Sequence, residues 1–112
     1  MPRFSAHKRI MRRIQKLKEE VQFNTQKIRE DMLSTLKEIF AIASQVAKGQ
    51  IEVDDRKPTL KQRQIWAKVA AYTAQIINGI CKSFDEKAID TQLDELERLI
   101  NEAKTGKETQ ET

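Results

Sequence analysis

Residues that break helices, cross-link chains or stack on ligands are scarce in this sequence. Its 112 residues include three glycines, two prolines, one cysteine and six aromatic side chains. So few glycines and prolines argue against a turn-rich β fold. Cys81 has no second cysteine to pair with, which excludes an intramolecular disulfide and a zinc site built on cysteines. We expect a buried, inert Cys81 thiol and a reducing, cytoplasmic location.

Motifs for catalysis and for metal binding are also missing. His7 is the single histidine, and the first acidic residue, Glu19, lies too far along the chain to join it as a ligand. The sequence has no glycine-rich phosphate loop and no nucleophile with a plausible histidine partner. We therefore expect no enzyme activity, no cofactor, no metal and no small-molecule substrate. Apolar runs fall short of the roughly 18 residues that span a bilayer, and no signal-peptide core is present.

A stripe of apolar residues at helical spacing is the strongest positive feature. Its members recur every three, four or seven residues, which places them on one side of a helix. This pattern predicts one long amphipathic helix over about residues 5–48, or two nearly collinear helices. A straight helix of that length would measure about 65 Å. Residues 21–26 are its weak point, where we expect a kink or a break. The stripe consists of Ile10, Ile14, Leu17, Val21, Ile28, Met32, Leu36, Ile39, Ala43 and Val46.

Two further helices are predicted after a linker over residues 49–59. Thr59 and Gln62 have the spacing of a capping box, so the second helix is expected over about 60–83. The apolar stripe changes phase between Phe84 and Ile89, which indicates a break at 83–85 and a third helix over about 86–104. The polar end, residues 105–112, is expected to be a disordered tail.

The predicted fold class is all-α, with a single helical domain over residues 1–104. One long N-terminal helix would pack on two shorter antiparallel helices. Because three helices would leave apolar surface uncovered along so long a helix, we expect a homodimer. The predicted interface between chains consists of Ile28, Met32, Leu36, Trp66, Ala70 and Ala74.

The charge distribution gives the only indication of function. The net charge of +4 is modest, yet residues 1–18 hold seven basic side chains and no acidic one. Residues 85–102 hold seven acidic side chains and two basic ones. Lysine and arginine on one helical face can follow phosphate groups. The predicted nucleic-acid-binding residues are Arg3, Lys8, Arg9, Arg12, Arg13 and Lys16.

Two functions remain open at this point. The chain is either a small nucleic-acid-associated accessory or regulatory protein without strong sequence selectivity, or a protein–protein adaptor or structural subunit. Contact with an anionic membrane surface is a third, weaker possibility. One feature separates the first two. Nucleic-acid binding requires the basic face of residues 3–18 to be accessible, whereas an adaptor allows the acidic residues 85–102 to neutralise it.

Overall fold

Four α-helices make up the computed structural model, which describes residues 6–23, 25–53 and 56–105. They are α1 (Ala6–Glu20), α2 (Gln26–Ala47), α3 (Leu60–Lys82) and α4 (Glu86–Thr105). No strand occurs in these ranges, and the nearest approach to one is an isolated bridge between Val53 and Arg56. The prediction of an all-helical bundle is confirmed.

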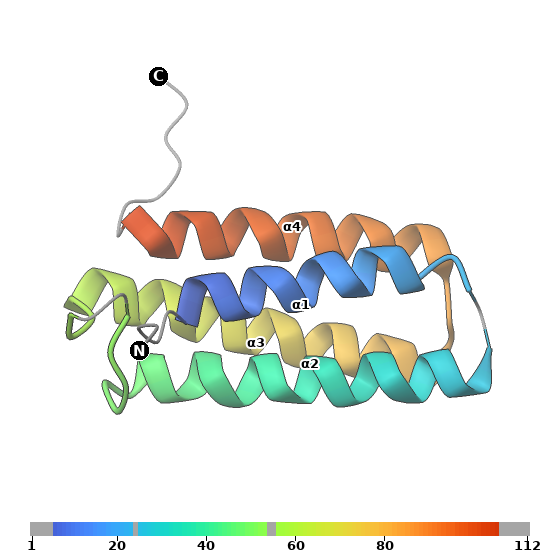
Figure 1. The fold of residues 1–112 in the computed structure, drawn as a ribbon, viewed down its shortest axis with the longest axis horizontal. Helices are drawn as coiled ribbons and strands as arrows, with labels where there is room; N and C mark the ends of the chain where they lie inside the picture. Colours follow the sequence, from blue (N-terminus) through green and yellow to red (C-terminus); the bar gives the residue numbers. More distant parts are fainter. Residues whose placement is uncertain (1–5, 24, 54–55, 106–112) are drawn as a thin grey trace, which may run out of the picture.

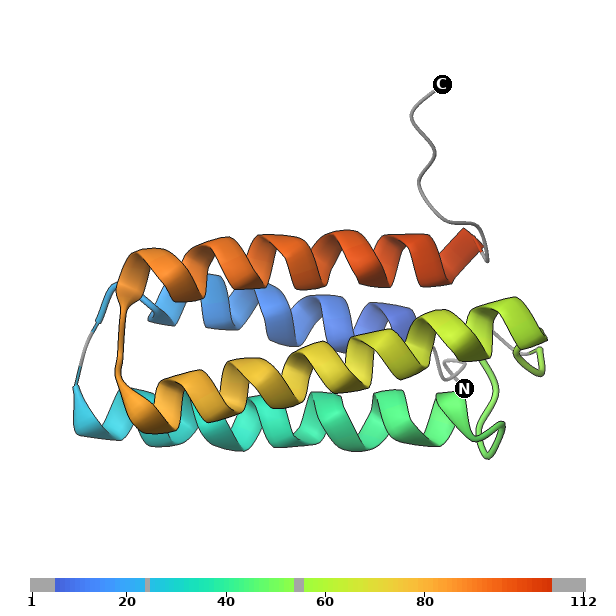
Figure 2. The ribbon, with the colours of Figure 1, turned by 180° about the vertical axis from the view of Figure 1, so that it is seen from behind.

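The helices form an antiparallel bundle in which each runs opposite to the one before it (Figure 1). α1 contacts α2 and α4, and α3 contacts the same two helices. α1 and α3 therefore lie diagonally across the bundle, and α4 closes it by packing beside both of them. From behind, α3 and α4 come closest where α3 begins and α4 ends, and they diverge toward the opposite end (Figure 2). The closest packing joins α2 to α3.

The core is built from apolar side chains that every helix turns inward. Trp66, Met32, Leu36 and Ile100 are fully buried among them. Burying a large apolar side chain stabilises the fold by about 1.5–3 kcal/mol relative to leaving it exposed. α1 contributes Ala6, Ile10, Ile14 and Leu17, the first members of the predicted stripe and the alanine before them.

The predicted single helix over residues 5–48 is wrong. The chain reverses direction at residues 21–25, so the two halves of the stripe face the same core from α1 and α2. Thr25 starts α2, because its hydroxyl oxygen accepts a hydrogen bond from the main-chain nitrogen of Ile28 at 3.1 Å. This cap satisfies a donor that the helix cannot pair internally. The break falls within the segment identified as weak, but it is a complete turn rather than a kink.

The other helix boundaries lie close to the predicted ones. Thr59 and Gln62 form both hydrogen bonds of a capping box at the start of α3. α3 ends at Lys82 and α4 begins at Glu86, on either side of the predicted break. Val53 is buried and Ile51 half-buried, so the connection between α2 and α3 is anchored to the core. Thr105 is the last residue of α4, and the remainder of the predicted tail, 106–112, lies outside the described residues.

The reversal also removes the reasoning that led to a dimer. Folding α1 back on α2 covers the apolar stripe within one chain. Of the predicted interface residues, Met32, Leu36, Trp66 and Ala70 are buried in the core, Ile28 is half-buried, and Ala74 is exposed. The buried ones belong to the interior of the bundle rather than to a subunit interface. Dimerisation stays a prediction. The expected burial of Cys81 is wrong, since its side chain is exposed.

Candidate nucleic-acid interface

The basic side chains predicted to bind nucleic acid lie mostly on the outer surface of α1. Lys8, Arg9, Arg12 and Lys16 are exposed, and Arg13 is half-buried. Ile10, Ile14 and Leu17 point into the core, and at 100° per residue the four exposed cations fall on the opposite side of the helix. Lys8, Arg12 and Lys16 follow one another at intervals of about 6 Å along the helix axis. Arg3 lies outside the described residues. The four exposed side chains are called the α1 basic row below.

Arg13 is held by α2 rather than projecting into solvent. Its Nε atom donates to Oε1 of Glu38 at 3.0 Å, and an Nη atom donates to the main-chain oxygen of Arg9 at 3.2 Å. An ion pair this exposed contributes about 0–1 kcal/mol to stability. The structure therefore places Arg13 beside the α1 basic row but assigns it a contact between helices.

The acidic helix α4 pairs with α1 at Lys18, which is not in the predicted binding set. The Lys18 ammonium group lies 2.8 Å from Oδ1 of Asp94 and 3.2 Å from Oε1 of Glu97. The hydrogen bond to Asp94 raises the pKa of Lys18 above its ordinary value, and Glu97 adds to the effect. Gln15 donates to the other carboxylate oxygen of Glu97 at 2.8 Å.

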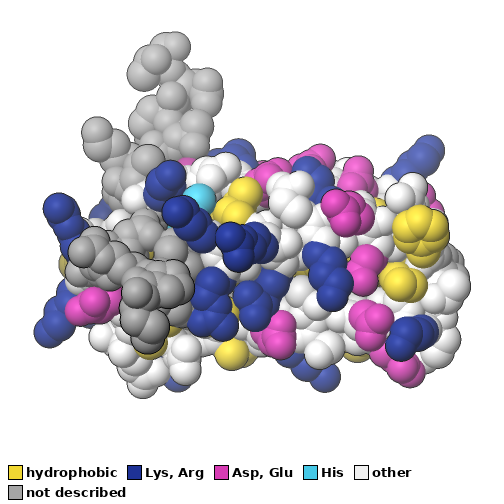
Figure 3. All heavy atoms as spheres, in the orientation of Figure 1, with side chains coloured by type: hydrophobic (Ala, Val, Ile, Leu, Met, Phe, Trp, Pro, Cys, Tyr) yellow, Lys and Arg dark blue, Asp and Glu magenta, His cyan; other side chains and the backbone are white. Residues whose placement is uncertain are grey.

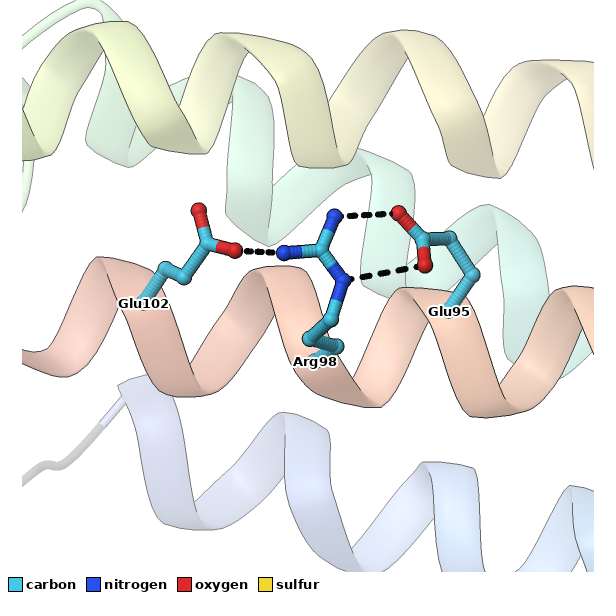
Figure 4. A network of polar contacts seen from close by, with 3 residues as sticks. All are labelled: Glu95, Arg98 and Glu102. Atoms are coloured by element: carbon cyan, nitrogen blue, oxygen red, sulfur yellow. Dashed lines mark hydrogen bonds and ion pairs between the residues drawn. The ribbon is translucent and has the colours of Figure 1, made fainter. Parts of the chain in front are cut away.

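Arginine on α4 itself neutralises part of the remaining acidic charge. Arg98 lies between Glu95 and Glu102, one turn before and one turn after it, and bonds to both carboxylates (Figure 4). The hydrogen bond from Arg98 holds the pKa of Glu95 below its ordinary value. Arg12 and Lys16 form no ion pair with any residue that the structure describes. The acidic segment thus leaves Arg12 and Lys16, the last two members of the α1 basic row, accessible.

Helix electrostatics give no structural reason for the cations at the start of α1. The first turn of this helix contains His7, Lys8 and Arg9 and no acidic residue. A cation near a helix N-terminus opposes the macrodipole, at a cost of about 0.3–1 kcal/mol. His7 turns toward α4, where its Nε2 atom lies 3.2 Å from Oδ1 of Asn101.

Other parts of the chain add cations that do not belong to the predicted nucleic-acid-binding set. Lys48 follows the end of α2, Lys57 precedes α3, and Lys104 lies in the last turn of α4. All three are exposed at the end of the bundle that holds the start of α1 (Figure 1). Figure 3 shows lysine and arginine side chains gathered over that half of one face, with acidic ones more frequent over the other half. Only the antiparallel topology brings these residues together, so no sequence motif marks them.

A hollow of about 280 Å³ lies between the end of α1 and the start of α4, lined by Lys18, Val21, Gln22, Glu86, Lys87 and Asp90. It holds neither a histidine nor a cysteine. Nowhere in the described ranges do three His, Cys, Asp or Glu side chains gather closely enough to hold a metal ion.

No described helix combines the length and the apolar character needed to cross a membrane. Comparisons with protein-family models, with curated proteins and with solved structures find no match to this chain.

Proposed function

We propose that this protein is a nucleic-acid-associated accessory protein that binds phosphate groups through the α1 basic row. The observation that carries the proposal is the accessibility of Arg12 and Lys16. Both are exposed, and neither is neutralised by a described acidic residue. The alternative of an adaptor allows the acidic residues 85–102 to neutralise this face. In the structure four of them form ion pairs with other cations, Asp94 and Glu97 with Lys18, and Glu95 and Glu102 with Arg98.

The mechanism of binding is electrostatic. Nucleic acids carry a dense row of phosphates with condensed counterions, and each lysine or arginine that replaces a counterion releases it into solution. The gain in entropy drives association, and added salt opposes it. A row of cations on a straight helix presents no set of donors matched to base edges in a groove. Binding is therefore expected to depend little on sequence.

The test is a binding titration with a fluorescent random-sequence DNA duplex of about 20 base pairs, measured by anisotropy over a salt series. The test variant is Arg12→Gln/Lys16→Gln, and the control is Lys27→Gln/Lys82→Gln, which removes the same charge from exposed positions elsewhere. We expect the test variant to lose at least about fivefold in affinity at low salt. Its log–log salt slope should fall by about two, one for each lost phosphate contact.

Substitution is preferable to deleting the N-terminal segment. Removing residues 1–18 would also remove Ala6, Ile10, Ile14 and Leu17 from the core, and the loss of binding would then report unfolding. Wild-type protein that binds neither the duplex nor its single strand at low salt would overturn the proposal and favour the adaptor. Equal affinities for the test and control variants would overturn the role of the α1 basic row.

A further inference from the structure

The fold gathers cations from all four helices at one end of the bundle, which is called the basic end below. At this end α1 and α3 begin, and α2 and α4 finish (Figures 1 and 2). Arg63 near the start of α3 donates from Nε to the main-chain oxygen of Ala47 at 2.9 Å. Gln62 donates to the main-chain oxygen of Ala103 at 3.4 Å. These contacts fix the start of α3 between the ends of α2 and α4.

The two halves of the bundle differ strongly in charge. Dividing each helix at its midpoint assigns residues 6–13, 37–53, 56–71 and 96–105 to the half with the basic end. That half contains 13 basic and four acidic side chains. The other half of the described residues contains six basic and nine acidic ones. The chain's modest net charge therefore conceals a pronounced polarity along the long axis of the bundle.

Backbone dipoles do not cancel this polarity. Two helix N-termini and two C-termini meet at the basic end, and their opposite partial charges offset one another. The excess positive charge is therefore that of the side chains. Lys48 and Lys57, in the connection between α2 and α3, and Lys104, in the last turn of α4, are exposed there. They continue the positive surface from the α1 basic row, which lies along the side of the bundle, onto its end. Asp54 and Asp55 lie outside the described residues.

We infer that the preferred ligand is a single-stranded nucleic acid, whose phosphates follow the α1 basic row and then turn onto Lys48, Lys57 and Lys104. This inference rests on the proposed function. A duplex has a persistence length of about 50 nm, so bending it sharply over the edge of a domain this small costs several kcal/mol. A straight duplex laid on α1 reaches the side of the bundle only. A single strand is flexible enough to follow positive charge around the edge.

Among the described residues, the exposed aromatic side chains are Phe23 and Phe40, and both lie away from this path; Phe4 lies outside those residues. Phe23 is in the turn between α1 and α2, at the opposite end of the bundle. Glu38 marks the side of α2 that contacts α1, because it accepts a hydrogen bond from Arg13. Phe40 comes two residues later, so its exposed side chain projects about 200° away from that side. Stacking on aromatic rings normally adds about 1–3 kcal/mol per base. Without it along the described path, affinity comes from phosphates, and adenine and uracil homopolymers should bind alike.

The test compares two charge-removing variants against two forms of one ligand. The end variant is Lys48→Gln/Lys57→Gln/Lys104→Gln, and its control is Lys27→Gln/Lys82→Gln/Lys87→Gln. The ligands are a labelled DNA strand of about 20 nucleotides and the duplex of the same sequence. We expect the end variant to lose at least about fivefold in affinity for the single strand. Its affinity for the duplex should equal that of the control.

Each outcome separates this inference from the proposed function. An end variant that binds the single strand like its control, or that weakens both ligands equally, overturns the inference. The effect of Arg12→Gln/Lys16→Gln then decides the proposed function independently. Wild-type protein that prefers the duplex also overturns the inference. A salt-sensitive self-association without nucleic-acid binding, seen by sedimentation, overturns both and assigns the charge polarity to contacts between copies.

Discussion

At the scale of single residues, Trp66 combines complete burial with an unpaired polar atom. Its side chain has no exposed surface, and the indole N–H finds no acceptor among the described residues. An unpaired buried donor costs about 1–3 kcal/mol. The ring still stabilises the fold because its apolar surface is removed from water. The residue thus contributes through packing and loses part of that gain at one atom.

A phenylalanine at this position should retain most of the packing and remove the unpaired donor. We expect Trp66→Phe to lower the free energy of unfolding by less than about 1.5 kcal/mol, because the lost volume is offset by the removed N–H group. Trp66→Ala should cost about 3–5 kcal/mol through the cavity it leaves. Urea denaturation at neutral pH measures both. If Phe proves as costly as Ala, the indole N–H has an acceptor in solution.

At the scale of helices, the start of α3 depends on one reciprocal pair. The hydroxyl oxygen of Thr59 accepts from the main-chain nitrogen of Gln62 at 3.0 Å. The side-chain oxygen of Gln62 accepts from the main-chain nitrogen of Thr59 at 2.9 Å. We expect Thr59→Ala to destabilise the protein by about 1 kcal/mol, and Thr59→Ser to cost much less because the hydroxyl remains. Denaturant titration checks this. Equal effects of Ala and Ser would show that the cap does not contribute.

The comparison of sequence with structure is clearest at the two helix breaks. Between α3 and α4 the apolar stripe changes phase, and the break at residues 83–85 was predictable from that change. Between α1 and α2 the step from Val21 to Ile28 is seven residues, which preserves helical phase. One continuous helix and two antiparallel helices then give the same spacing of apolar residues, because in both cases residues 10–21 and 28–46 turn their apolar side toward one core. Periodicity identifies the buried face of a helix but not the direction in which the next helix runs.

The same limit applies to the candidate site at the scale of the whole molecule. The α1 basic row was predictable because its members lie close together in the sequence. The position of Lys104 beside Lys48 and Lys57 was not, because the antiparallel topology alone brings the end of α4 to the connection between α2 and α3. The acidic helix α4 does form ion pairs with α1, but the α1 residue involved is Lys18, which lies outside the predicted binding set. Which cation meets which carboxylate depends on the register of two helices, and that register follows from core packing.

A surface that serves binding should contribute little to the free energy of unfolding. Comparing cations of the α1 basic row with Lys18, a cation that pairs with α4, tests this. Arg12 and Lys16 form no ion pair with a described residue, whereas Lys18 contacts two carboxylates. We expect Arg12→Gln/Lys16→Gln to change the free energy of unfolding by no more than about 0.5 kcal/mol, because no described ion pair is lost. Lys18→Gln should lower it by up to about 1 kcal/mol, because the ion pairs are lost.

Urea denaturation at about 10 mM and about 1 M salt tests this, since the screening length shortens from about 30 Å to about 3 Å between them. The difference between the two variants should shrink at high salt if it is electrostatic. The raised pKa of Lys18 means that its contribution is complete at pH values below the ordinary lysine pKa of 10.5 and is lost only as the pH rises through the higher folded-state value. Measurement at pH 7 therefore captures all of it. If Arg12→Gln/Lys16→Gln destabilises the fold as much as Lys18→Gln, the α1 basic row is structural and its proposed role in binding loses its main support.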